Sequence, residues 1–149
     1  MIDGVALVPL TRIGDERGAL LHMLRSDAPH FHGFGEVYFS LVKPPSIKAW
    51  HRQHVMTRHY AVPCGRARIV LYDDRRDSPS RGEVQEVLLG EDNYQLLIIP
   101  PMVWSGFTAL ADRPALIADC TTHPHDPAQV SRRDPFDPTI PYRWEPAAP

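Results

Sequence analysis

Residues 67–100, "ARIVLYDDRRDSPSRGEVQEVLLGEDNYQLLIIP", decide the fold class. They hold three short apolar runs, at residues 67–72, 84–89 and 95–100, and each run has the length of a β-strand. The segments between the runs, "DSPSRG" and "LGEDN", are rich in the Gly, Pro, Asp, Asn and Ser that favour turns. The stretch therefore predicts consecutive strands joined by turns, the pattern of an antiparallel sheet.

The same pattern extends on both sides of this stretch. Further apolar runs of strand length occupy residues 5–10, 19–24, 37–42 and 115–120. No stripe of helical period is long enough to compete with them. We therefore expect an all-β protein, an antiparallel double-sheet jelly roll or barrel.

The end of the chain has a different character. Residues 121–149, "TTHPHDPAQVSRRDPFDPTIPYRWEPAAP", are rich in proline and poor in strand pattern. We interpret residues 1–149 as a single domain, in which residues 121–149 wrap over the body and the final "EPAAP" is frayed.

Composition excludes several classes of function. The chain has 149 residues, 43% hydrophobic and 23% charged, with a net charge of -2, so nothing global points to a nucleic-acid or membrane partner. No apolar run approaches the roughly 20 residues of a membrane-spanning helix, and "MIDGVALVPLTR" lacks the features of a secretion signal. Cys64 and Cys120 form no CxxC pair and are expected to be buried thiols, which favours a cytoplasmic location.

The histidines raise the question of a metal site. His51, His54 and His59 form the tightest cluster of the eight in the chain. Spacings of three and five residues place neighbouring members on opposite faces of a regular strand, and His51 and His59 lie too far apart to share one ion. The pairs in "HFH" and "HPH" sit in loops without firm geometry, so we predict no metal site.

Five stretches occur in the order seen in one known family. They are "GDERGALL", "KAWHRQ", "CGRARIVLYDDRRDSPSRG", "LGEDNYQLLIIPPMVWSGF" and "RRDPFDPTIPYRW". Together they resemble the dTDP-4-dehydrorhamnose 3,5-epimerase family over residues 13–144. The resemblance implies a cupin-type jelly roll that is usually dimeric and needs no metal or other cofactor.

The resemblance also assigns roles to two residues. His51, in "KAWHRQ", falls on the family's general base, and Asp134, in "RRDP", falls on the carboxylate that pairs with that base. Histidine suits this role because its pKa lies near working pH. The family reaction inverts a carbon beside a C4 ketone, and a carboxylate would fix the tautomer of the base.

Four further residues are implied to bind the substrate. Arg17, in "DERG", falls on an arginine that contacts the nucleotide diphosphate, and Gln53 matches a position on the substrate side. Lys48 stands where the family has arginine, and Arg58 stands where it has a lysine near the ketone. Charge is kept at both places, and cations there would stabilise the negative charge that develops on the ketone oxygen.

Three departures concern the chemistry. Met102 and Ser105 replace the glycine and the histidine of a family turn, and the family's catalytic tyrosine falls on Ala118. The expected proton donor is therefore missing. Three explanations remain open: another donor, such as Tyr60, His59, His123 or an ordered water; an isomerase that needs only one face of the sugar; or a protein that binds its ligand without turnover.

These observations predict an epimerase or isomerase acting beside the C4 ketone of a nucleotide-linked 4-keto-6-deoxy sugar, with His51 and Asp134 as its proton-abstracting pair. The alternative is a non-catalytic protein of the same fold that binds a nucleotide-diphosphate sugar or another acidic ligand. We further expect a homodimer, because the strand at residues 5–10 could exchange with the sheet of a neighbouring copy.

Overall fold

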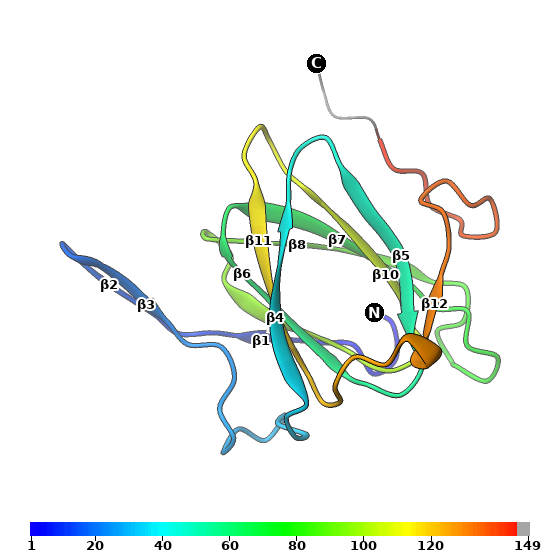
Figure 1. The fold of residues 1–149 in the computed structure, drawn as a ribbon, viewed down its shortest axis with the longest axis horizontal. Helices are drawn as coiled ribbons and strands as arrows, with labels where there is room; N and C mark the ends of the chain where they lie inside the picture. The colour runs from blue at the N-terminus through cyan, green and yellow to red at the C-terminus, as the bar shows by residue number, and fades with distance from the viewer. Residues whose placement is uncertain (146–149) are drawn as a thin grey trace.

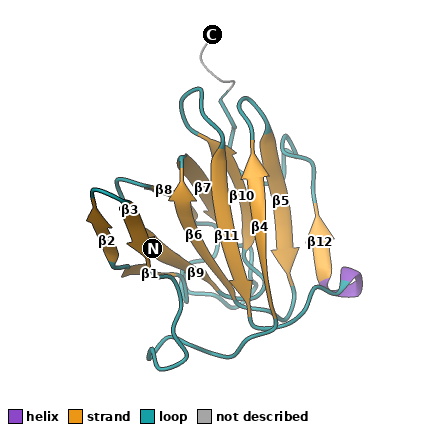
Figure 2. Cartoon of the chain, turned by 60° about the vertical axis from the view of Figure 1, so that its left-hand side comes forward, coloured by secondary structure: helices purple, strands orange, loops and turns teal. Residues whose placement is uncertain are grey.

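The structure, a computed structural model, describes residues 1–145. It confirms the predicted fold class: two five-stranded antiparallel sheets pack face to face (Figure 2). The first sheet has the order β1-β9-β6-β11-β4. Its strands are β1 (Ala6–Pro9), β9 (Gln95–Ile99), β6 (Arg58–Cys64), β11 (Ala115–Thr121) and β4 (Glu36–Val42).

The second sheet has the order β12-β5-β10-β7-β8. Its strands are β12 (Val130–Arg132), β5 (Ile47–Gln53), β10 (Trp104–Ala109), β7 (Arg66–Tyr72) and β8 (Val84–Gly90). The three runs that decided the fold class are thus found in β7, β8 and β9. Strands β7 and β8 pair along their whole length, whereas β9 crosses to the other sheet.

The main core lies between the sheets. Ile69 and Leu71 of β7 alternate inward and pack with Leu97 and Ile99 of β9, and all four side chains are fully buried. The alternation of inward and outward side chains along a strand is what lets each sheet present one apolar face to the other.

The C-terminal segment covers the outer face of the second sheet. Its Ile140 and Trp144 pack against Trp50, Val70 and Trp104 in a separate apolar cluster. The segment also contains a 3₁₀ turn (Pro127–Gln129) and β12, which pairs with β5 at the edge of the sheet. The sequence pattern missed this short strand. The predicted frayed end, residues 145–149, falls outside the described residues except for Glu145.

A two-stranded arm projects from this body. Strands β2 (Arg12–Asp15) and β3 (Gly18–Leu21) pair only with each other and extend away from the two sheets (Figure 1). Ile13 and Leu20 face each other across the arm and are both exposed. Because an isolated hairpin is marginally stable in water, the arm lacks the apolar support that the other strands have.

The turn between β7 and β8 is held by one buried carboxylate. Asp73 accepts five hydrogen bonds, from the Arg75 backbone and guanidinium and from the hydroxyls of Ser78 and Ser80. Ser80 and Arg75 also bind the backbone of Asp3, so the turn fastens the start of the chain to the body. A helix capable of spanning a membrane is absent from the described part of the chain.

Candidate active site

A cavity of about 410 Å³ lies between the two sheets, a volume typical of pockets that take a small organic ligand. One wall comes from β4, β6 and β11 and is lined by Glu36, Tyr38, Ser40, Arg58, Tyr60, Ile117 and Asp119. The other wall comes from β5, β10, β12 and the loop that precedes β12. It is lined by Lys48, His51, Gln53, Phe107, His125 and Arg132. The lining is therefore mostly polar, and each wall carries charged side chains.

Four of the six residues predicted from the sequence meet in this cavity: Lys48, His51, Gln53 and Arg58. On a regular strand, Lys48 and His51 would face opposite sides because they are three residues apart. Strand β5 carries an extra residue at this point, since Ser105 pairs with His51 and Phe107 pairs with Lys48. This β-bulge turns Lys48 to the same side as His51.

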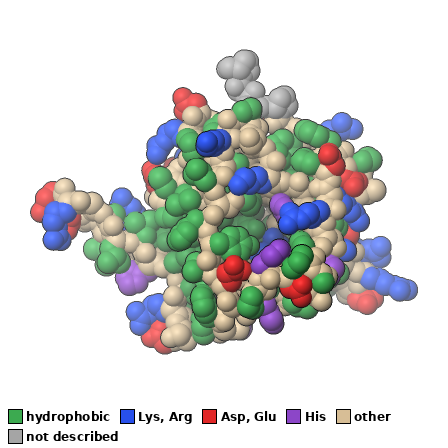
Figure 3. Space-filling view, in the orientation of Figure 1, with side chains coloured by type: hydrophobic (Ala, Val, Ile, Leu, Met, Phe, Trp, Pro, Cys, Tyr) green, Lys and Arg blue, Asp and Glu red, His purple; other side chains and the backbone are tan. Residues whose placement is uncertain are grey.

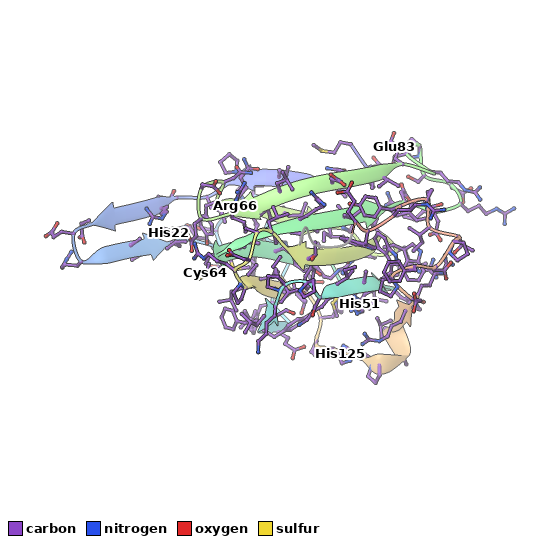
Figure 4. All side chains as sticks on the ribbon, turned by 90° about the horizontal axis from the view of Figure 1, so that it is seen from above. His22, His51, Cys64, Arg66, Glu83 and His125 are labelled. Atoms are coloured by element: carbon purple, nitrogen blue, oxygen red, sulfur yellow. The ribbon has the colours of Figure 1, made fainter. Side chains whose placement is uncertain are left out.

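His51 lies in the middle of its wall, between β10 and β12, and is half-buried (Figure 4). Burial lowers its pKa to about 4, and the positive charges of Arg132, Arg58 and Lys48 add to this shift. His51 is therefore a neutral imidazole at neutral pH, able to accept a proton.

Arg58 links the two walls through the floor of the cavity. Arg58 is 2% exposed, and its guanidinium donates hydrogen bonds to the hydroxyls of Ser105 and Tyr60 and to the carbonyl of Val103. Ser105, where the resemblance placed a histidine of the family, thus serves as an acceptor for Arg58. Burial raises the pKa of Tyr60, so its hydroxyl stays protonated at neutral pH.

Two exposed cations lie at the edge of the cavity. Lys48 donates to the Ser40 hydroxyl at 3.0 Å and to the Leu41 carbonyl at 2.8 Å, across to the opposite wall. Arg132, which the sequence did not single out, lies beside His51 on β12. Both are accessible to an anionic group of a ligand.

Asp134 does not join His51 in this structure. It is exposed just after β12, where its carboxylate accepts a hydrogen bond from the backbone of Phe136 at 2.8 Å. Within residues 1–145, no hydrogen bond connects the two side chains, and no carboxylate raises the pKa of His51. The reason is local: aspartate before proline forms a turn with the backbone that follows it.

Arg17 also lies outside the cavity. It sits at the turn of the projecting arm, where its guanidinium pairs with Asp15 at 2.6 Å. Figure 4 shows His22 beside this arm, well away from His51 in the body. Within its own subunit, Arg17 cannot contact a ligand in the cavity.

Ala118, where the resemblance placed the family's tyrosine, is buried and does not line the cavity. Its neighbour Asp119 does, together with Ile117 two residues earlier on the same face of β11. The sequence contained one signal for Asp119, a charged residue inside the apolar run "ALIADC". Burial raises its pKa to about 6, although Arg58 and Tyr38 hold it below the value that burial alone would give.

Other predicted groups lie elsewhere. His59 is fully buried and its ring bonds the Cys120 carbonyl, while His123 bonds Thr122, and neither lines the cavity. Within residues 1–145, no three His, Cys, Asp or Glu side chains come close enough to hold a metal ion. Both cysteines are free, but Cys64 is exposed at the end of β6, so the expectation of two buried thiols is wrong for Cys64.

Comparison with known proteins gives matches over the whole chain. The family model for dTDP-4-dehydrorhamnose 3,5-epimerase matches residues 1–148. The probable low-salt glycan biosynthesis epimerase Agl13 of Haloferax volcanii is 37% identical over 130 residues, covering 86% of this chain and 80% of that protein. The spore coat polysaccharide biosynthesis protein SpsL of Bacillus subtilis is 37% identical over 146 residues, covering 97% of each.

Among solved structures, a dTDP sugar isomerase from Desulfovibrio desulfuricans superposes with a TM-score of 0.94 at 49% identity, covering 96% of this chain and 92% of that one. The resemblance seen in the sequence motifs therefore extends through the entire fold. The chain belongs to the dTDP-4-dehydrorhamnose 3,5-epimerase family of nucleotide-sugar epimerases.

Proposed function

We propose that this protein is an epimerase or isomerase of a nucleotide-linked 4-keto-6-deoxy sugar, in which His51 removes the proton from a carbon beside the C4 ketone. The main support for this proposal is the environment of His51. Its neutral imidazole lines a cavity large enough for a sugar, and Lys48, Arg58 and Arg132 line the same cavity. A carbon acid of this kind reacts only if its enolate is stabilised. Lys48 and Arg58 supply positive charge for that purpose.

The cations also explain how His51 becomes a stronger base. The pKa of His51 is low because it is partly buried among positive charges. A bound diphosphate would pair with the accessible Lys48 and Arg132 and so offset part of that charge. Ligand binding then moves the pKa of His51 upward, toward working pH.

Pairing of His51 with Asp134 stays a prediction from the sequence. It requires the Asp134 carboxylate to leave the turn in which it binds the backbone of Phe136. The two relatives named for glycan and spore coat polysaccharide biosynthesis support a role in making a deoxysugar for such a polymer. A cytoplasmic location belongs to the same proposal, and the two free cysteines agree with a reducing compartment.

Hydrogen exchange tests this function. The protein is incubated in deuterium oxide with dTDP-4-keto-6-deoxyglucose, and deuterium at C3 and C5 of the sugar is followed by NMR. We expect wash-in by the wild type and a loss of at least about 100-fold in His51→Gln, because a general base contributes on this scale. His54→Gln is the matched control, since His54 bonds Ser131 outside the cavity and should leave exchange unchanged.

Two results would redirect the proposal. If the wild type binds dTDP but exchanges no hydrogen, the protein is the non-catalytic binding protein that the sequence left open. Asp134→Asn is a third variant for the same experiment. A loss of deuterium exchange equal to that of His51→Gln supports the predicted pair, and unchanged exchange removes Asp134 from the mechanism.

We also propose that the protein works as a homodimer that covers the arm. Ile13 and Leu20 on the arm are exposed, and so are Phe39 and Leu41 on β4, the edge strand of its sheet. Figure 3 shows hydrophobic side chains spread over the front of the molecule, where Figure 1 places β4. A second copy would bury both surfaces and would bring Arg17 to a cavity other than its own.

Light scattering after gel filtration tests the dimer. We expect a mass of two chains for the wild type and of one chain for Phe39→Asp, because a charge cannot be buried unpaired in an apolar interface. Leu88→Asp is the control, since Leu88 is similarly exposed but lies on β8 of the other sheet. A monomeric wild type, or a dimer that survives in Phe39→Asp, contradicts this interface.

A further inference from the structure

The wall opposite His51 holds an unusual carboxylate. Asp119 on β11 is 1% exposed and lines the cavity. Within residues 1–145, neither of its oxygens accepts a hydrogen bond of ordinary length and angle. The Tyr38 side chain and the His59 backbone lie close enough to lower its pKa, but neither makes a short, well-aligned hydrogen bond to it. A buried carboxylate held this weakly is costly to a fold and is usually compensated. Its position in the lining of the cavity suits a chemical role.

The groups facing Asp119 come from every strand around it. Glu36 and Tyr38 on β4 and Arg58 and Tyr60 on β6 are its neighbours on the same wall. The opposite wall presents three further charged or titratable groups, which are Lys48, His51 and Arg132. The pKa of Asp119 is raised to about 6 by burial and held from rising further by Arg58 and Tyr38. Below that pH the carboxyl is protonated and can donate.

The placement of Asp119 relative to His51 matters more than its titration. His51 belongs to β5 of one sheet and Asp119 belongs to β11 of the other, and both line the same cavity. A sugar ring bound between the sheets therefore presents one face to His51 and the other to Asp119. Inversion of a carbon needs such an arrangement, because the proton must leave from one face and return on the other.

We propose that Asp119 is the second catalytic residue, which protonates the sugar on the face opposite to the one that His51 deprotonates. This inference rests on the proposed function and supplies its missing donor. In the first step the C–H bond beside the ketone breaks, its electrons form the enolate, and His51 takes the proton. In the second, the enolate carbon bonds the proton of the Asp119 carboxyl and the ketone returns.

After one turnover, His51 carries an extra proton and Asp119 is a carboxylate. His51 releases its proton to solvent and Asp119 regains one, so no oxidant, reductant or other co-reactant is required. Tyr60 and Tyr38, whose pKa values are raised mainly by burial, keep their protons through this cycle.

The test separates hydrogen exchange from inversion. Asp119→Asn and the wild type are incubated with dTDP-4-keto-6-deoxyglucose in deuterium oxide, and both deuterium wash-in and the epimerised sugar are measured. We expect Asp119→Asn to keep the His51-dependent wash-in while epimer formation falls at least about 100-fold. Asp119→Glu keeps a carboxyl group and should recover part of the epimer formation. Binding of dTDP by each variant shows that it is folded.

Each other outcome overturns the inference. Epimer formation at the wild-type rate in Asp119→Asn removes Asp119 from the chemistry, and equal loss of exchange and epimer in a variant that binds dTDP gives it a structural role. If the wild type exchanges hydrogen without forming an epimer, the proposed role of His51 stands and that of Asp119 is contradicted. If the wild type neither exchanges hydrogen nor forms an epimer, the proposed function and the proposed role of Asp119 are both contradicted.

The pH profile of the wild type gives a second readout, which needs no variant. The ratio of epimer formed to hydrogen exchanged should fall about tenfold for each pH unit above the pKa of Asp119, because only its protonated form donates. A structural role for Asp119 would not produce this dependence. A ratio that stays constant across that range contradicts the proposal even if Asp119→Asn fails to fold.

Discussion

Two carboxylates of this protein are buried to the same degree and lie in opposite environments. Asp73, in the turn after β7, is 0% exposed and Asp119, in the cavity, is 1% exposed. Burial alone would raise the pKa of both. For Asp73, hydrogen bonds from Arg75, Ser78 and Ser80 outweigh burial and hold the pKa well below its usual range. For Asp119, burial prevails and the pKa rises to about 6.

The difference shows how one fold uses the same side chain in two ways. Both groups are shielded from water, and the number of donors that replace the water differs between them. Asp73 accepts five hydrogen bonds and is a fixed anion that shapes a turn. Asp119 accepts no hydrogen bond of ordinary length and angle within the described residues, and the nearby Tyr38 and His59 backbone only partly offset burial, so its charge state stays open to change near neutral pH.

The largest expected effect comes from removing the satisfied carboxylate. Asp73→Asn turns one acceptor oxygen into a donor, so two or three of the five hydrogen bonds lose their acceptor, and Arg75 loses the negative charge that it pairs with. We expect a loss of about 4 kcal/mol in the free energy of unfolding at neutral pH, because breaking a buried, charged network leaves uncompensated groups inside the protein. Urea unfolding measures this loss.

Two further variants check the cause. Ser78→Ala removes one of the five hydrogen bonds and should cost about 1 kcal/mol. Asp77→Asn changes an exposed aspartate of the same turn and should leave stability within about 0.5 kcal/mol of the wild type. If Asp73→Asn is as stable as Asp77→Asn, the buried network does not hold the turn.

The scaffold was predictable from sequence because its signals are local. The alternation in residues 67–72 and the Ser and Pro of "DSPSRG" predict the strand and the turn, and the structure places β7 and the Asp73 network there. Even so, the pattern missed β12, a short strand formed only because the C-terminal segment lies along β5. Local patterns do not show which edge a later segment covers.

The site was less predictable because it depends on register. His51 and Arg58 were identified from motifs, and both line the cavity. Lys48 faces the same side as His51 only because of a bulge in β5 that the pattern of residue types does not reveal. Asp119 was missed for the same reason, since the choice between Ala118 and Asp119 depends on which face of β11 meets the cavity.

Removing the Asp119 carboxylate is expected to change the free energy of unfolding by a smaller amount, and with the opposite sign. The pKa of Asp119 is raised from 3.8 to about 6, so the folded protein binds more protons than the unfolded chain between these values. The stability that this group contributes is fully present below pH 3.8 and is lost as the pH rises through about 6. Asp119→Asn has no such loss, because its side chain does not titrate.

The free energy of unfolding of Asp119→Asn, minus that of the wild type, should therefore increase with pH, by about 3 kcal/mol at most. Urea unfolding of both proteins from acid to neutral pH measures this difference. The pKa of His51 is shifted in the opposite direction, and its contribution to stability rises over much of the same range. That contribution is present in both proteins, so it cancels in the comparison. A difference that does not change with pH would mean that the pKa of Asp119 is the same in the folded and the unfolded protein. A difference that falls as the pH rises would mean that Asp119, like Asp73, is a stabilised anion.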